Sequence, residues 1–170
     1  MPRTAWITVV MALYGCVAAN AWGQQAVAQM APTAGNAAKG SVTFTQQGND
    51  VRVSARLTGV PPGKHGFHIH EKGDCSAPDG MSAGGHFNPT GKPHGNPADA
   101  DHHAGDMIMI EADASGNASL DTTLTGVAVG QGPADIVGKA VIVHKDPDDY
   151  KTQPTGNSGA RIACGVIART

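Results

Sequence analysis

Residues 51–57 read VRVSARL, and in this stretch apolar side chains alternate strictly with polar or charged ones. Because successive side chains of a β-strand point to opposite faces of a sheet, this alternation predicts a strand with one buried and one solvated face. The turn-forming residues 47–50 (QGND) come directly before it, and residues 41–46 predict a partner strand. The stretch therefore predicts an antiparallel hairpin.

Further short strands are predicted around this hairpin, because the chain is rich in turn formers, with 23 Gly and 11 Pro, and only 15% charged. Two long segments, residues 71–106 and 145–159, lack sustained periodicity, and loops of that length usually carry function. We expect an all-β fold, an eight-stranded antiparallel Greek-key β-barrel or sandwich with two long functional loops. The additional strands are expected at residues 26–30, 66–70, 107–111, 118–124, 139–143 and 161–168.

The first 23 residues predict a cleaved signal peptide, which would leave residues 24–170 as one domain. Arg3 supplies the positive charge that is typical of the first residues of a signal peptide. Residues 5–15 form an uncharged, mostly apolar run that is too short to span a bilayer. Residues 19–21 (ANA) have the small-x-small form of a cleavage site. Residues 13–16 (LYGC) also resemble a lipoprotein box, so a lipid anchor at Cys16 is the alternative. Either route predicts export without a transmembrane segment.

The net charge argues against one class of partner, and the cysteines predict a disulfide. A formal net charge of −2 comes without a polybasic face, so no nucleic-acid partner is expected. Export would place the chain in an oxidising compartment, where disulfides persist. Removal or lipidation of Cys16 leaves Cys75 and Cys164 as the two thiols available to pair, which predicts a single long-range disulfide.

All but one of the eight histidines lie between His65 and His103. His68 and His70 are separated by one residue on a predicted strand, so both rings project from the same face. Metal coordination could order the long loop that follows, because three imidazoles with one carboxylate suit zinc and imidazoles alone suit Cu(II). The loop offers His86, His94, His102, His103 and Asp106, and His144 at a later strand end could complete a second set.

Four motifs occur in order along the chain: residues 66–71 (GFHIHE), 85–89 (GHFNP), 103–106 (HAGD) and 156–167 (GNSGARIACGVI). They resemble the successive signatures of the copper/zinc superoxide dismutases, over most of the chain from about residue 26. The resemblance implies a Greek-key β-barrel with one copper and one zinc ion per chain. It implies an enzyme that converts two superoxide anions and two protons to O₂ and H₂O₂ by alternating Cu(II)/Cu(I) chemistry.

The place of Cys75, directly after Asp74 and well before His86, resembles the exported bacterial branch of that family. This branch implies a periplasmic location, or a lipoprotein at the membrane if Cys16 is lipidated. It leaves open whether the protein is a monomer or a homodimer.

The resemblance also implies roles for individual residues. Arg161 would attract and hydrogen-bond the superoxide anion, and His86 would bridge the two metals and carry a proton. Asp148 would hydrogen-bond one histidine of each metal, and the Cys75–Cys164 disulfide would tie the first long loop to the last strand. The implied copper ligands are His68, His70, His86 and His144, and the implied zinc ligands are His86, His94, His103 and Asp106.

Simpler roles are expected for the remaining candidates. His65 would make a structural hydrogen bond, His102 would be solvated, and Met107 and Met109 would pack in the core. Two other functions stay open: an exported copper- and zinc-binding or copper-delivery protein without catalysis, and a binding module that uses the histidines only for zinc. The first would be expected to have lost metal ligands, whereas this sequence has all of them. The second would show neither absorption of bound Cu(II) nor consumption of superoxide.

Overall fold

The computed structural model describes residues 23–170. The predicted signal segment before Gly23, with Cys16, lies outside the described residues. Among residues 23–170, no helix is long and apolar enough to cross a membrane.

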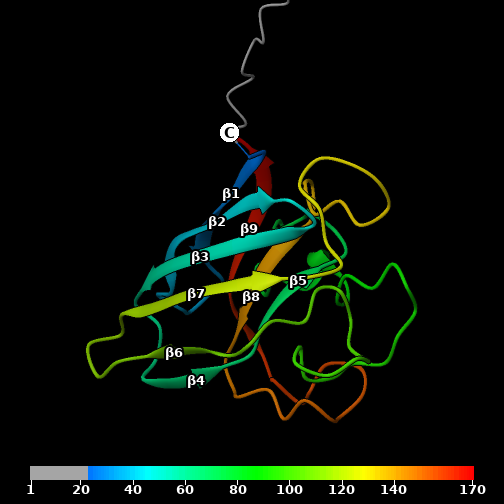
Figure 1. Ribbon diagram of the computed structural model, residues 1–170. Helices are drawn as coiled ribbons and strands as arrows, with labels where there is room; N and C mark the ends of the chain where they lie inside the picture. Colours follow the sequence, from blue (N-terminus) through cyan, green and yellow to red (C-terminus); the bar gives the residue numbers. More distant parts are fainter. Residues whose placement is uncertain (1–22) are drawn as a thin grey trace, which may run out of the picture.

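The described chain is all-β, which confirms the expected fold class (Figure 1). Its helical content is one short 3₁₀ turn, η1 (Met81–Ala83), within the described residues. The strands are β1 (Gln25–Pro32), β2 (Lys39–Gln47), β3 (Asp50–Thr58), β4 (Gly63–His65), β5 (Phe67–His70), β6 (Ile110–Ala112), β7 (Ala118–Leu124), β8 (Ala140–His144) and β9 (Arg161–Arg169).

Two local differences from the expected strands have physical reasons. The described chain has nine strands where eight were expected, because β4 pairs with β6 while the strand that follows, β5, pairs with β8. The strand expected at residues 107–111 begins only at Ile110. The backbone N–H of Met109 donates to the Tyr150 hydroxyl rather than to a neighbouring strand, at 2.9 Å.

The strands form a nearly closed antiparallel barrel in the order β4-β6-β7-β3-β2-β1-β9-β8-β5. Several neighbours, such as β3 with β7 and β1 with β9, are far apart in sequence, as Greek-key connections require. The two strands at the ends of this order, β4 and β5, are joined by Gly66 alone. The chain itself therefore closes the barrel where hydrogen-bond pairing between strands stops.

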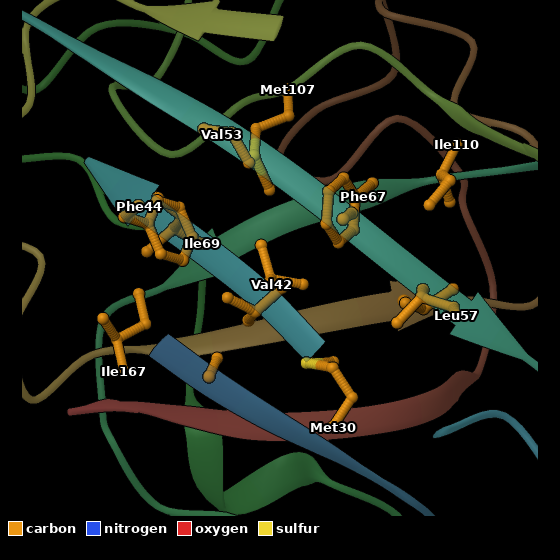
Figure 2. Packing of buried hydrophobic residues seen from close by; sticks show 14 of the residues in the cluster. Met30, Val42, Phe44, Val53, Leu57, Phe67, Ile69, Met107, Ile110 and Ile167 are labelled. Atoms are coloured by element: carbon orange, nitrogen blue, oxygen red, sulfur yellow. The ribbon is translucent and has the colours of Figure 1, made fainter. Parts of the chain in front are cut away.

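The barrel interior is filled by the apolar faces of these strands. Val51, Val53, Ala55 and Leu57 are buried, as the alternation in β3 predicts. Figure 2 shows Phe44, Phe67, Ile69 and Met107 among the side chains that pack in this core. Met107 is fully buried, so its expected place in the core is confirmed. Phe67 and Ile69 belong to β5, so their burial fixes the orientation of the two histidines on the same strand.

The two long loops lie next to one another beside β5 and β8 (Figure 1). Backbone hydrogen bonds from Lys145 to Ala160 (2.7 Å) and from Asp146 to Ser158 (3.0 Å) hold the second loop at its base. The first loop returns to β5 through hydrogen bonds described below.

Candidate metal centre

Seven side chains from strands and loops come together in two buried groups that share one member. Within each group, one nitrogen or oxygen from every residue lies within 4.8 Å of the others. The first group is His68, His70, His86 and His144, and the second is His86, His94, His103 and Asp106. The structure thus brings together every residue for which a metal was expected, in the two expected sets, with His86 in both.

Backbone hydrogen bonds attach the first long loop to β5. The Ile69 N–H donates to the Gly105 carbonyl, and the Phe87 N–H donates to the Ile69 carbonyl, both at 2.8 Å. A side chain on Gly105 would overlap the carbonyl oxygen of Ile69, so this approach needs glycine. The two attachments place His86 and Asp106 beside the histidines of β5.

The first group presents unprotonated ring nitrogens to a common point. His70 Nδ1 and His144 Nδ1 lie 2.9 and 3.2 Å from the carbonyl oxygens of Gly84 and Gly159. A carbonyl only accepts hydrogen bonds, so each Nδ1 carries the proton and each Nε2 keeps a lone pair. These two Nε2 atoms lie 3.3 Å apart. His68 gives its Nε2–H to Asp148, at 2.6 Å, and its Nδ1 is buried without a hydrogen-bond partner.

His86 presents one ring nitrogen to each group. Its Nδ1 lies 2.8 Å from Asp106 Oδ1 and 3.3 Å from His103 Nδ1, within the second group. Its Nε2 is buried and has no partner among the described residues. Its ring centroid lies 4.0 Å from that of His68, a member of the first group. Buried nitrogens normally find hydrogen bonds, so the unpaired lone pairs of His68 Nδ1 and His86 Nε2 at the first group fit a metal ion.

The second group combines three imidazoles with one carboxylate. Asp106 Oδ2 lies 3.1 Å from His94 Nδ1 and accepts the backbone N–H groups of His103 (2.9 Å) and Gly95 (3.1 Å). These backbone donors fix the carboxylate in a position where it reaches all three rings. Three nitrogens and one oxygen make a set that suits tetrahedral zinc.

A family model described as copper/zinc superoxide dismutase (SODC) matches residues 38–167. The chain belongs to this family. All four sequence motifs quoted above lie within the matched residues, as do both groups of side chains.

The copper/zinc superoxide dismutase fold is also seen in a similar solved structure. The clock protein EA4 is 39% identical in sequence, and the similarity covers 88% of this chain and 96% of that chain with a TM-score of 0.79. That protein is described as a clock protein, so family membership alone does not identify the activity.

In the present protein, a member of the copper/zinc superoxide dismutase family, Asp148 links the two groups of side chains. Its Oδ2 accepts from His68 Nε2 (2.6 Å) and its Oδ1 accepts from His94 Nε2 (3.0 Å), so one buried carboxylate orients a ring of each group. A side chain on Gly156 would overlap both Asp148 and His94, and Gly156 also has a positive φ of 65°. The loop therefore needs glycine at this point.

Burial and carboxylates act in opposite directions on the histidines. Burial lowers the pKa of His86 to about 4 and that of His144 to about 3, and it holds the pKa of His70 well below its usual value. Neutral imidazoles keep the lone pairs that metals need. Burial also lowers the pKa of His94, but hydrogen bonds to Asp106 and Asp148 outweigh it and raise this pKa to about 9.

The two carboxyl groups are held ionised. Burial raises their pKa values, but hydrogen bonds from histidines outweigh it and place the pKa of Asp106 and of Asp148 well below the usual range. The second group therefore combines negative charge with three imidazoles, whereas the first group has only imidazoles.

Arg161 lies at the start of β9, half-buried beside the first group. Its Nη1 donates to the Gly80 carbonyl at 2.7 Å and its Nη2 to the Gly84 carbonyl at 2.6 Å. The Cys75–Cys164 disulfide has a Cα–Cα distance of 5.8 Å, which confirms the expected pairing. It joins the loop that carries both carbonyls to the strand that carries the arginine.

The remaining histidines stay outside both groups. His65 is buried with its ring between the carbonyl oxygens of His144 (2.9 Å) and Pro61 (2.7 Å), where its role is structural, as expected. His102 is half-buried and bonded to its neighbour's carbonyl rather than fully solvated. Gly156, which contacts the site, opens the last of the four sequence motifs, whereas sequence reasoning does not single out Gly84 or Gln153. For Gly84, the glycine pair next to His86 is a local signal, whereas Gln153 carries none.

Proposed function

We propose that this protein is a superoxide dismutase that converts two superoxide anions and two protons to O₂ and H₂O₂. The observation that supports it most strongly is the position of His86, whose two ring nitrogens serve two different groups of four side chains. An imidazole shared in this way becomes a bridging ligand only when a cation lies on each side. Family membership makes copper and zinc the expected pair.

One copper and one zinc ion per chain fit the chemistry of the two donor sets. The all-imidazole group suits copper, and the group with Asp106 suits zinc. We assign copper to His68, His70, His86 and His144, and zinc to His86, His94, His103 and Asp106.

Bound copper would supply the one-electron chemistry, taking an electron from one superoxide and giving it to a second. The protein's own residues do the rest. Arg161 offers a fixed positive charge that attracts the anion and donates hydrogen bonds to it. His86 holds a proton on Nε2 in one half of the cycle and releases it to the product in the other. Asp148 keeps the rings of His68 and His94 in place.

A copper-binding or copper-delivery role without catalysis is the alternative. The similarity to EA4 supports this alternative, because a chain 39% identical to this one is described as a clock protein rather than as an enzyme. A delivery protein would bind copper and release it to an acceptor without consuming superoxide. Turnover by the isolated, metal-loaded protein separates the two functions.

The test is metal analysis combined with a superoxide assay on wild type and His144→Ala. His144 belongs to the first group only, so we expect the variant to lose copper and activity and to retain zinc. Gln29→Ala is the control, because Gln29 is exposed on β1 and lies outside both groups, and it should keep both metals. Full activity in His144→Ala, or a wild type that binds both metals without turnover, would sink the proposal.

We also propose that the protein is exported, most simply to a bacterial periplasm. The apolar segment at residues 5–15 supports this, and so does the Cys75–Cys164 disulfide, because such bonds persist in oxidising compartments. The intact mass of the protein recovered from the periplasmic fraction tests it. Cleavage near residue 23 or lipidation at Cys16 would each give a defined mass, and a full-length cytosolic product would contradict export.

A further inference from the structure

Gln153, in the second long loop, makes two hydrogen bonds to the backbone of His94, 59 residues away in sequence. The His94 N–H donates to Gln153 Oε1 at 2.9 Å, and Gln153 Nε2 donates to the His94 carbonyl at 2.8 Å. A primary amide has one accepting and one donating end, so it can satisfy both polar groups of one residue at once. The Gln153 amide thus bonds to the backbone of His94 in the way that a residue of a neighbouring β-strand would.

The backbone of His94 has little else to hold it. Residues 91–96 form no strand or helix, and no other described residue makes a hydrogen bond to the His94 N–H or carbonyl. Pro93 comes directly before His94 and has no N–H to offer. The Gln153 amide is therefore the described contact to both the N–H and the carbonyl of His94. The peptide unit that contains this carbonyl is also held on its other side, where the Gly95 N–H donates to Asp106.

The loop presents Gln153 in a defined position. Asp149 Oδ1 accepts the N–H groups of Lys151 (2.9 Å) and Thr152 (2.8 Å), and the Gly156 N–H donates to the Thr152 carbonyl at 2.7 Å. Gln153 Nε2 also donates to the Lys151 carbonyl at 3.2 Å. Because its amide is already held within the loop by the bond to Lys151, Gln153 loses little further conformational freedom when it binds His94.

The same loop also holds the ring of His94, through Asp148 Oδ1. Three polar atoms of His94, its N–H, its carbonyl and its Nε2, are thus fixed by one loop, and Nδ1 remains directed at the second group. His94 belongs only to that group, whereas Asp148 contacts both. Gln153 therefore acts on one metal position without touching the other.

We propose that Gln153 is a positioning residue for the zinc group, which raises the affinity of that group for zinc through the backbone of His94. The inference rests on the proposed function, because it takes the second group to be a zinc site. A ligand that is already oriented before the metal arrives loses less entropy on binding. Removal of a residue that orients a ligand typically costs about 10- to 100-fold in metal affinity.

The experiment compares metal-free wild type with Gln153→Met, which keeps the length of the side chain but removes both hydrogen-bonding groups. Gln153 is exposed, so this change leaves no cavity. Gln29→Met, on an exposed position of β1, is the matched control for the chemical change. Each protein is titrated with Zn²⁺ against a competing chelator, and then with Cu²⁺ in saturating zinc.

We expect Gln153→Met to bind zinc about tenfold more weakly than wild type and Gln29→Met to bind it unchanged. Copper affinity should be equal in all three proteins. In the metal-free state, amide hydrogen exchange at His94 should be faster in Gln153→Met while exchange at Val53 in the barrel stays the same. Gln153→Asn, whose shorter side chain cannot make both bonds, should behave like Gln153→Met and serves as the second variant.

Equal zinc affinity in the two Gln153 variants and the control would overturn the inference, and so would a matching loss of copper affinity, which would indicate general loosening. These results would leave the proposed function intact, because wild type would still bind both metals. A wild type that binds no zinc would instead sink the metal assignment and the inference with it.

Discussion

Arg161 and His70 donate hydrogen bonds to the same carbonyl oxygen, that of Gly84. The guanidinium that would attract the substrate is therefore tied to a ring of the proposed copper group through a single backbone atom. Movement of the Gly84 peptide would displace both, so the two groups are fixed relative to each other.

Replacement of Arg161 by lysine should lower kcat/KM for superoxide about tenfold, and replacement by alanine about a hundredfold. Lysine keeps the charge but has no planar fork with which to bond Gly80 and Gly84 and still face the anion. Superoxide consumption measured against ionic strength checks this, and only the alanine variant should lose the salt dependence. Arg52→Lys, an exposed change on β3, should have wild-type kinetics. Wild-type kcat/KM in Arg161→Ala would contradict the role.

Replacement of Asp148 by alanine should weaken the binding of both metals, each by about 10- to 100-fold. Alanine offers no acceptor to either ring N–H, so both His68 and His94 lose the hydrogen bond that orients them. Competition titrations with Zn²⁺ and Cu²⁺ measure both affinities. The loss at both groups distinguishes this variant from Gln153→Met, which should affect zinc alone. Asp50→Ala, at the first residue of β3, is the control, and an effect on one metal only would contradict the shared role.

Loss of the disulfide should lower the free energy of unfolding by about 4 to 5 kcal/mol, the value that chain entropy gives for a loop closed across 89 residues. Cys75→Ala and Cys164→Ala should each show this loss in urea denaturation at fixed metal content. The double variant should be no less stable than the single ones, because both remove the same bond. Additive losses would show that the individual side chains, rather than the bond, provide the stability.

The metal-free protein should lose stability as the pH falls from about 6.5 to about 4. The folded-state pKa values of His86 and His144 lie near 4 and 3, below the usual 6.5, so the unfolded chain binds more protons in this range. The effect of His94 on stability has the opposite sign, because its folded-state pKa is raised to about 9. Its contribution to the free energy of unfolding is complete below about pH 6.5 and is lost as the pH rises through 9. Urea denaturation of chelator-treated protein from pH 7 to pH 4.5 measures the acid effect. His144→Gln should flatten the dependence, and a flat wild-type profile would contradict it.

Features that depend on local pattern were predictable from the sequence. The alternation at Val51, Val53, Ala55 and Leu57 identifies a half-buried strand because a strand places every second side chain on the same face. The spacing of His68 and His70 identifies two rings on one face for the same reason. The ligand sets needed the family's motifs as well, because no spacing rule brings His144 to His86.

Features that depend on contacts between distant segments were not predictable in this way. The separate strand β4 exists because Gly63, Lys64 and His65 find partners in β6, far along the chain. The bond from Met109 to Tyr150 shortens the following strand, and the amide of Gln153 meets His94 across 59 residues. In each case a backbone group bonds to a residue far away in the sequence. The residues next to either partner in the sequence do not indicate which distant residue it will contact.

The single residue Gly66 between the two terminal strands of the barrel order has a consequence for behaviour at high concentration. Exposed strand edges are templates on which other chains can add and begin to aggregate. Here the two end strands are consecutive parts of one chain, and the N–H and carbonyl of Ile69 in β5 are already bonded to Gly105 and Phe87, so the edge of β5 is covered along part of its length. A cut in the backbone at this point would let β4 and β5 separate and expose both strand edges to other molecules, and the protein should then aggregate more readily.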